Sequence, residues 1–284
     1  PAASLMKIIT ASAVIEKNNL DPEDELSYRG GCMRLTNINW LVDPRRDSQM
    51  MTFAKAFGVS CNTIFGRLAL YNVGLPTLKS FSEKFMFNKP IPSDIKLQTS
   101  LFLLPSVHSA TPQEVAEAGA GFSPSRISPV HAALLAAVVG NNGIMMAPYL
   151  VESAYDAHGK LVYSAKPQQV SHVFSSQTAE KIKILMQETI ASGTGRMYFR
   201  KNGTRDEIAE IGGKTGTLSD PENRDILYNW FSGIAPLSSP NSVAIGTFVA
   251  SPNNWVIRAS SIAQKTLANY LKIERDEQRV ATSW

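Results

Sequence analysis

Three strand-like runs near the C-terminus most constrain the fold of this chain of 284 residues. They cover residues 209–218, 227–235 and 243–250, and the connections between them are short and rich in turn residues. Strands joined in this way favour an antiparallel meander. A helical pattern over residues 259–272 would cover one face of that sheet. The order of the elements therefore predicts an α+β fold, with an antiparallel sheet flanked by helices.

The first of these runs carries two threonines around a glycine, preceded by a lysine: Lys214, Thr215, Gly216 and Thr217. We expect an exposed edge strand, whose unpaired backbone groups accept an extended peptide as an additional strand. Gly216 would leave room for that peptide, while Lys214 would supply a positive charge and Thr217 a hydroxyl group. The predicted ligand is an extended peptide that ends in a carboxylate. A hairpin strand with a surface lysine is the plainer interpretation of the tetrapeptide alone.

A buried helix is predicted over residues 4–15, which are apolar nearly all round. Its one charged side chain is Lys7, which projects from the same face as Ser4. Burial lowers the pKa of a lysine, and the neutral amine can then take a proton from a neighbouring hydroxyl. The plainer interpretation is a capping serine and a lysine that reaches solvent. A second Ser-x-x-Lys, from Ser93 to Lys96, lies among prolines and is predicted to be a surface loop.

A core helix so close to the first residue implies that something should pack before it. We therefore expect the N-terminal strands of the sheet to be missing from this chain. Apolar residues recur at helical spacing over residues 48–72, which predicts two helical segments interrupted near Gly58. Ser60 and Asn62 lie on that short interruption, so both are expected to project into a cleft between helices. A serine that merely caps a helix is the alternative.

The rest of the chain is predicted from periodicity and turn residues. Helices are expected over residues 75–87, 129–139 and 176–190, a strand over 145–151, and a hairpin turn at 156–159. Residues 88–128, which contain five prolines, are expected to be rich in loops. His131 lies in an apolar helix and is expected to be a partly buried histidine with a hydrogen-bond partner, without a catalytic role.

Composition excludes several functional classes. The chain is 44% hydrophobic and 18% charged, as globular proteins are, and its net charge of +4 comes without basic runs, so we expect no nucleic-acid partner. No apolar run reaches the length of a membrane span. No motif for a metal or a nucleotide cofactor occurs, so neither is predicted. Cys32 and Cys61 fit no metal or redox pattern; they allow one disulfide, but we expect two free thiols.

Three short motifs follow one another along the chain: Ser4-x-x-Lys7, Ser60-x-Asn62 and Lys214-Thr215-Gly216-Thr217. Their order resembles that of the active-site motifs of the penicillin-binding proteins and serine β-lactamases. Longer segments are similar to the transpeptidases of this family, around residues 57–69, 128–148, 192–196 and 230–236. The resemblance covers nearly the whole chain. It implies one transpeptidase domain over residues 1–284, with a mainly helical lobe over roughly 16–150 and a sheet lobe over roughly 1–15 and 151–284.

The resemblance also implies a function, the cross-linking of peptidoglycan stem peptides by a D,D-transpeptidase. Ser4 would attack the D-alanyl-D-alanine peptide bond and Lys7 would take its proton. Ser60, helped by Lys214, would pass a proton to the departing D-alanine. The acyl-enzyme would then react with the amine of a second stem peptide, or with water in a carboxypeptidase.

Binding roles follow from the same resemblance. Asn62 would hold the donor amide, while Thr215 and Thr217, with Gly216 between them, would bind the terminal carboxylate. The backbone N–H groups of Ser4 and Thr217 would hold the oxyanion. The implied partners are stem peptides and β-lactam antibiotics, and the implied location is outside the cytoplasmic membrane. An upstream anchor and a cell-wall synthesis complex are expected of the parent protein.

Two alternatives remain open. A serine β-lactamase needs a second base for deacylation, and no Glu-x-x-Leu-Asn loop occurs between residues 62 and 214; Asn62 also argues against the Ser-x-Val pattern of class D enzymes. A β-lactam sensor would keep its acyl group as a transpeptidase does. A peptidoglycan-binding module without catalysis is the second alternative.

Overall fold

The computed structural model describes residues 1–36, 38–200, 204–220, 223–239, 241–252 and 257–281. The helices of this part are η1 (Ala3–Met6), α1 (Lys7–Asn18), α2 (Phe53–Gly58), α3 (Asn62–Arg67), η2 (Leu68–Val73), α4 (Leu75–Lys84), α5 (Pro112–Ala120), α6 (Pro129–Gly140), α7 (Ser176–Ala191), α8 (Arg196–Arg200), α9 (Arg205–Ala209) and α10 (Ala259–Ala281). The strands are β1 (Glu25–Tyr28), β2 (Gln49–Thr52), β3 (Leu101–Phe102), β4 (Ser125–Arg126), β5 (Ile144–Met146), β6 (Ser153–Tyr155), β7 (Leu161–Ser164), β8 (Gln169–His172), β9 (Gly212–Ser219), β10 (Ile226–Ala235) and β11 (Val243–Pro252).

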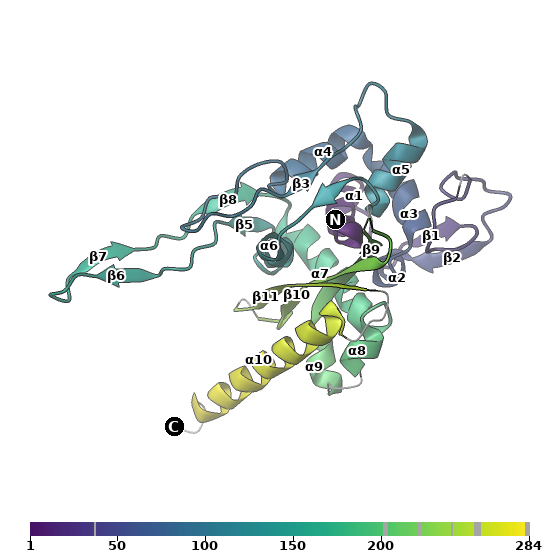
Figure 1. Cartoon of the computed structure of the whole chain (residues 1–284). Coiled ribbons are helices and arrows are strands. Elements are labelled where there is room, and N and C mark those ends of the chain that lie inside the picture. The colour runs from purple at the N-terminus through teal and green to yellow at the C-terminus, as the bar shows by residue number, and fades with distance from the viewer. Residues whose placement is uncertain (37, 201–203, 221–222, 240, 253–256, 282–284) are drawn as a thin grey trace.

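A three-stranded antiparallel sheet in the order β11–β10–β9 lies at the centre, with β9 at one edge of the strands described. Thr215 of β9 is opposite Phe231 of β10. Helix α10 packs on one face, and α6, α7 and η1 pack on the other (Figure 1). The predicted α+β fold, the meander and its covering helix are confirmed, although α10 continues beyond residue 272. Parts of the strand connections, residues 221–222 and 240, lie outside the described residues.

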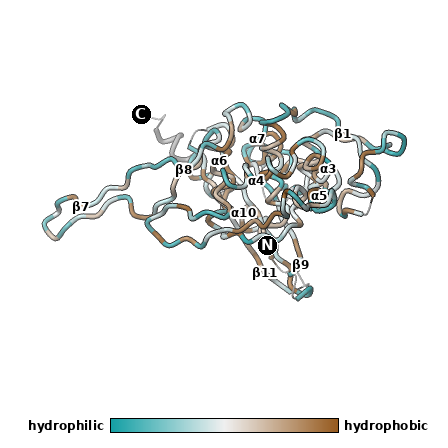
Figure 2. Tube along the Cα trace, turned by 90° about the horizontal axis from the view of Figure 1, so that it is seen from above, coloured by the Kyte–Doolittle hydropathy of each residue, from teal (hydrophilic) through white to brown (hydrophobic). Residues whose placement is uncertain are grey.

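The core is built around α1, whose residues from Lys7 to Ile15 are all buried. Apolar side chains from α2, α3, α6 and α7 join α1 in one cluster. Figure 2 shows the hydrophobic stretches gathered where α3, α6 and α7 lie, while the outermost turns are hydrophilic. The first helix therefore confirms the prediction of a buried element, although it opens with the 3₁₀ turn η1.

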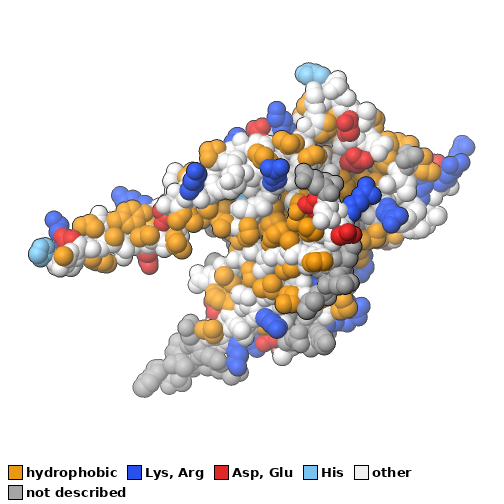
Figure 3. Space-filling model, in the orientation of Figure 1, with side chains coloured by type: hydrophobic (Ala, Val, Ile, Leu, Met, Phe, Trp, Pro, Cys, Tyr) orange, Lys and Arg blue, Asp and Glu red, His pale blue; other side chains and the backbone are white. Residues whose placement is uncertain are grey.

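A two-stranded arm projects from the body, formed by β5 with β8 and, further out, β6 with β7 (Figure 1). Its hairpin turn at 156–159 was predicted, but the strand predicted over 145–151 was partly wrong, because β5 ends at Met146. Large apolar side chains are exposed on the arm and appear as orange patches in Figure 3; they include Leu150, Tyr155, Leu161, Val162 and Tyr163.

One other prediction was partly wrong. The helix expected from residue 48 begins only at Phe53, because β2 pairs with β1 and Thr52 then caps α2 by accepting a hydrogen bond from the Lys55 amide. The region 88–128 is rich in loops, as predicted, and it also contains α5. Pro112 occupies the first turn of that helix, where a proline is tolerated, and Thr111 caps it together with Glu114.

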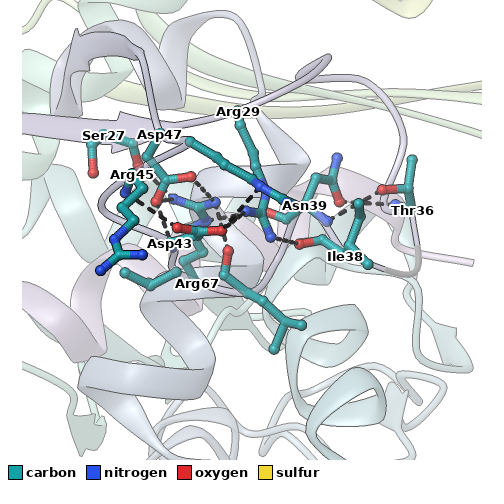
Figure 4. A network of polar contacts seen from close by, with 12 residues as sticks. Ser27, Arg29, Thr36, Ile38, Asn39, Asp43, Arg45, Asp47 and Arg67 are labelled. Atoms are coloured by element: carbon teal, nitrogen blue, oxygen red, sulfur yellow. Dashed lines mark hydrogen bonds and ion pairs between the residues drawn. The ribbon is translucent and has the colours of Figure 1, made fainter.

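The prediction of two free thiols was wrong, because Cys32 and Cys61 form a disulfide. Sequence spacing could not show this, since tertiary contacts return the loop after β1 to the start of α3. Figure 4 shows the network that holds this loop. The buried Arg67 side chain at the end of α3 pairs with Asp47 at 2.8 Å and donates to the carbonyl oxygens of Ser27, Asn39 and Leu41.

No helix within the described residues is both long and apolar enough to cross a membrane. The same residues contain no group of three or more His, Cys, Asp or Glu side chains arranged to hold a metal ion.

Candidate active site

A pocket of about 160 Å³ brings the three sequence motifs together. It lies between η1, the residues that join α2 to α3, and the edge strand β9. Five of the predicted site residues line it: Ser4, Ser60, Asn62, Thr215 and Thr217. The other lining residues are Ala3, Met33, Ala120, Gly121, Phe122, Thr194 and Leu218.

Lys7 is fully buried behind the pocket. Its Nζ lies 2.9 Å from Ser4 Oγ, 2.6 Å from Asn62 Oδ1 and 2.6 Å from the Ala120 carbonyl oxygen. The last two atoms can only accept hydrogen bonds. A neutral amine has two N–H groups and one lone pair, so it can donate to Asn62 and Ala120 while its lone pair faces the Ser4 hydroxyl. This set of contacts therefore suits a lysine that takes the Ser4 proton.

Burial also favours the neutral amine. Desolvation, with a smaller contribution from the nearby Lys214 charge, holds the Lys7 pKa well below its usual value. Lys214 is likewise fully buried, and desolvation lowers its pKa to about 7. The Nζ atoms of Lys7 and Lys214 lie 5.7 Å and 5.4 Å from the ring centroids of Phe65 and Phe57. The aromatic surroundings explain why both ammonium groups are poorly solvated.

The second motif is held from both sides. Asn62 Oδ1 faces Lys7, and Nδ2 donates to the Met33 carbonyl oxygen at 2.5 Å. Met33 follows Cys32, whose disulfide partner Cys61 lies inside the motif. Ser60 has a φ of 61°, in the left-handed region that residues other than glycine rarely adopt. Such backbone persists only where the surroundings impose it, and it is common at functional sites.

A close approach of α5 to η1 supplies the third Lys7 partner. Gly121 ends α5 with a φ of 92°, and a Cβ there would lie 2.4 Å from the Ala3 carbonyl oxygen. A residue with a side chain would collide with the backbone next to Ser4. Glycine therefore lets the end of α5 approach, which places the Ala120 carbonyl against Lys7.

Strand β9 offers hydroxyl groups at the pocket. Thr215 is buried, whereas Thr217 is exposed. Asn229 Nδ2 donates to Thr217 Oγ1 at 3.0 Å, and Asn229 Oδ1 accepts from the Ala259 amide. The Thr217 hydroxyl thus receives one hydrogen bond from the sheet and keeps its own proton for a ligand. The Lys214 ammonium donates to the Thr215 carbonyl oxygen at 3.1 Å.

The reason expected for Gly216 needs correction. A Cβ at this position would meet the Ala2 carbonyl oxygen at 3.2 Å and Ala3 Cβ at 3.5 Å. The missing side chain therefore makes room for the segment before Ser4, and Gly216 does not line the pocket.

Sequence reasoning missed several groups at this site. Thr194 lines the pocket, with Oγ1 2.5 Å from Thr215 Oγ1; its segment had been noted only for its resemblance. Asn229 and the Ala120 carbonyl left no signal in the sequence. Ser93 and Lys96 lie apart from the site in a loop, as predicted.

His131 has a hydrogen-bond partner, as expected, but the prediction that it is only partly buried was wrong, because it lies in the core with 1% of its surface exposed. Its Nε2 is 2.7 Å from the Phe85 carbonyl oxygen, and burial lowers its pKa to about 4.

Residues 1–271 match the profile of a family described as the penicillin binding protein transpeptidase domain. The chain is 26% identical over 275 residues to stage V sporulation protein D of Bacillus subtilis. The aligned region covers 95% of this chain and 41% of that protein. It is 28% identical over 261 residues to peptidoglycan D,D-transpeptidase PbpA of Mycolicibacterium smegmatis, covering 88% of this chain and 49% of that protein. The chain thus spans half or less of the length of these two relatives.

Solved structures show the same fold. The D,D-transpeptidase domain of a peptidoglycan glycosyltransferase from Eggerthella lenta superposes with a TM-score of 0.77 at 26% identity, covering 96% of this chain and 65% of that one. Penicillin-binding protein A from M. tuberculosis, in an imipenem acyl-enzyme complex, gives a TM-score of 0.74 at 22% identity, covering 93% of this chain and 58% of that one.

Proposed function

The chain belongs to the penicillin-binding protein transpeptidase family, and from this premise we propose that its pocket is the acylation site of a peptidoglycan D,D-transpeptidase. The family match confirms the resemblance drawn from the order of the motifs. One observation carries the proposal. The Lys7 amine is fully buried and lies 2.9 Å from the Ser4 hydroxyl, and its other two contacts, Asn62 Oδ1 and the Ala120 carbonyl oxygen, can only accept hydrogen bonds.

In the first step Ser4 Oγ attacks the carbonyl carbon of the donor's terminal D-alanyl-D-alanine bond, and its proton passes to Lys7. The backbone N–H groups of Ser4 and Thr217 hold the oxyanion. The C–N bond then breaks, and the proton that Lys7 took passes through Ser60, with the help of Lys214, to the departing D-alanine amine, which leaves Lys7 neutral and the Ser60 hydroxyl restored. The product is an ester between Ser4 and the shortened donor.

Substrate binding uses the edge of β9. The donor lies along this strand as an extended peptide, with its terminal carboxylate against the hydroxyl groups of Thr215 and Thr217. The positive charge of Lys214 behind the strand adds electrostatic attraction. Asn62 holds the donor amide on the opposite side of the pocket.

In the second step the amine of another stem peptide attacks the ester. A new amide bond forms, the bond to Ser4 Oγ breaks, and the proton of the amine returns through Lys7 to Ser4. The pocket is lined by hydroxyl, amide and apolar side chains. Hydrolysis by a β-lactamase requires a base that activates water beside the ester, so we expect a β-lactam adduct on this chain to persist.

The proposed partners are stem peptides as substrates and β-lactams as inhibitors, which mimic the donor. Structures of penicillin-binding protein A from M. tuberculosis as acyl-enzyme complexes with imipenem and penicillin G support this choice. We also propose that the site works outside the cytoplasmic membrane, where peptidoglycan lies, and that the protein joins a cell-wall synthesis complex.

Covalent labelling by a fluorescent penicillin tests the proposal. The unmutated chain should be labelled, and Ser4→Ala should abolish the label, because the nucleophile is lost. Ser93→Ala is the matched control, since it alters the other Ser-x-x-Lys and should label normally. Intact mass should show one adduct that survives for hours rather than seconds. Labelling of the Ser4→Ala protein, or none of the unmutated chain, would refute the assignment.

A further inference from the structure

The loop between α7 and α8, residues 192–195, makes hydrogen bonds both to the segment before the second motif and to the third motif. Thr194 N donates to the Gly58 carbonyl oxygen at 3.0 Å, two residues before Ser60. Thr194 Oγ1 lies 3.3 Å from the same oxygen and 2.5 Å from Thr215 Oγ1. Thr194 and Thr215 both line the pocket that contains Ser4. The Thr194 side chain thus contacts both the backbone just before the second motif and the Thr215 hydroxyl of the third.

The position of this loop is fixed by its glycine and its serine. A Cβ on Gly193 would lie 2.1 Å from the Gly58 carbonyl oxygen, so only glycine allows this approach. Ser192 Oγ lies 2.5 Å from Lys55 Nζ and also donates to Glu188. Thr194 is therefore held against Thr215 by the backbone and by a polar cluster outside the pocket.

The two hydroxyl groups share one proton in the contact between them, so one must donate and the other must accept. With an empty pocket, Thr194 can donate to the Gly58 carbonyl oxygen and accept from Thr215. A carboxylate only accepts hydrogen bonds. If Thr215 donates to a bound carboxylate, the short contact requires Thr194 to donate to Thr215. The Gly58 oxygen then still accepts the Thr194 N–H, so the reversal costs little.

We propose that Thr194 is a positioning residue that turns the Thr215 hydroxyl toward the terminal carboxylate of the ligand. It thereby sets the preference of the site for ligands that end in a free carboxylate. Hydrogen bonds in such a chain strengthen one another, and the last of them, to the carboxylate, is charge-assisted. A ligand whose carboxylate is esterified gains little from this arrangement. The inference rests on the proposed function, because it concerns the same acylation reaction.

The test compares benzylpenicillin with its methyl ester, and the readout is the second-order rate constant of acylation measured by intact mass. The unmutated chain should react faster with the free acid. Thr194→Val keeps the shape but removes the hydroxyl, and it should slow the reaction with the acid about tenfold while leaving that with the ester nearly unchanged. Thr194→Ser keeps the hydroxyl and should restore the preference for the acid.

The outcomes separate the two proposals. If the unmutated chain is not acylated by either compound, the proposed function fails, and this inference fails with it. If the chain is acylated but Thr194→Val keeps or raises the preference for the acid, only the inference on Thr194 is overturned. Equal slowing with acid and ester would show that Thr194 acts through packing alone, which also overturns it.

Discussion

Replacing Asn62 by aspartate would place a carboxylate beside the buried Lys7 amine. Asn62 Oδ1 is 2.6 Å from Lys7 Nζ in a fully buried contact. At an effective dielectric constant of about 20, two unit charges about 4 Å apart interact by about 4 kcal/mol. Part of that energy is lost in desolvating the new carboxylate. A rise of roughly 1–3 units in the Lys7 pKa is therefore expected from Asn62→Asp.

The consequence is slower acylation at neutral pH. Lys7 takes the Ser4 proton only when neutral, and each unit added to its pKa lowers the neutral fraction about tenfold at any pH below that pKa. Acylation of Asn62→Asp by a penicillin should accordingly fall near pH 7, by up to about 1,000-fold. It should recover as the pH rises, because deprotonation restores the base. Rates followed by intact mass across the pH range measure both effects.

Asn62→Ala is the matched control. Both variants lose the hydrogen bond from Nδ2 to the Met33 carbonyl oxygen, so a general loosening of the second motif affects them equally. Only the aspartate adds a charge, so only it should move the pH profile upward. If the two variants and the unmutated chain share one pH midpoint, Lys7 is not the base whose protonation limits acylation.

Further predictions concern the network of Figure 4 and the second buried lysine. Arg67→Met should lower the free energy of unfolding by about 3 kcal/mol, because it leaves the buried Asp47 carboxylate without its partner. Arg46→Met removes an exposed pair with Asp43 and should cost less than about 1 kcal/mol in the same denaturant titration; equal costs would contradict the role given to burial. Lys214 loses its charge as the pH rises through its pKa of about 7. Acylation by the free acid should therefore fall relative to the ester between about pH 6 and about pH 9, and a constant ratio would exclude Lys214 as the source of charge attraction.

Much of the fold could be predicted because it depends on local patterns. The β9–β11 meander follows from strand-like runs separated by turns, and the buried helix α1 from its apolar composition. The failures arose partly from local signals that were missed and partly from pairing between distant segments. The prolines of residues 88–128 conceal the start of α5, because Pro112 lies between Thr111 and Glu114, which form a capping box there. The strand β2 was missed because its partner β1 lies across a polar loop.

In the candidate site, too, the features set by local sequence could be predicted and the tertiary contacts could not. Spacing along a helix put Ser4 and Lys7 on one face, and the order of the three motifs indicated that they meet. The sequence did not indicate three hydrogen bonds that affect the reactive groups. They join Lys7 to the Ala120 carbonyl, Thr215 to the Thr194 hydroxyl, and Thr217 to the Asn229 amide. Two of these come from segments that no motif had marked as part of a site.

By itself the sequence determined the α+β fold class, the family, and the residue types that the chemistry requires. Periodicity, turn residues and short motifs each involve residues that are close together in the sequence, so they can be recognised without knowledge of the fold. Only the tertiary structure decided that Cys32 bonds to Cys61, that Gly216 serves the segment before Ser4, and that Lys7 is surrounded by acceptors. The physical reason is that every residue carries a backbone carbonyl, and every residue except proline also carries an N–H. Which of these groups faces a buried lysine depends on packing between segments more than a hundred residues apart.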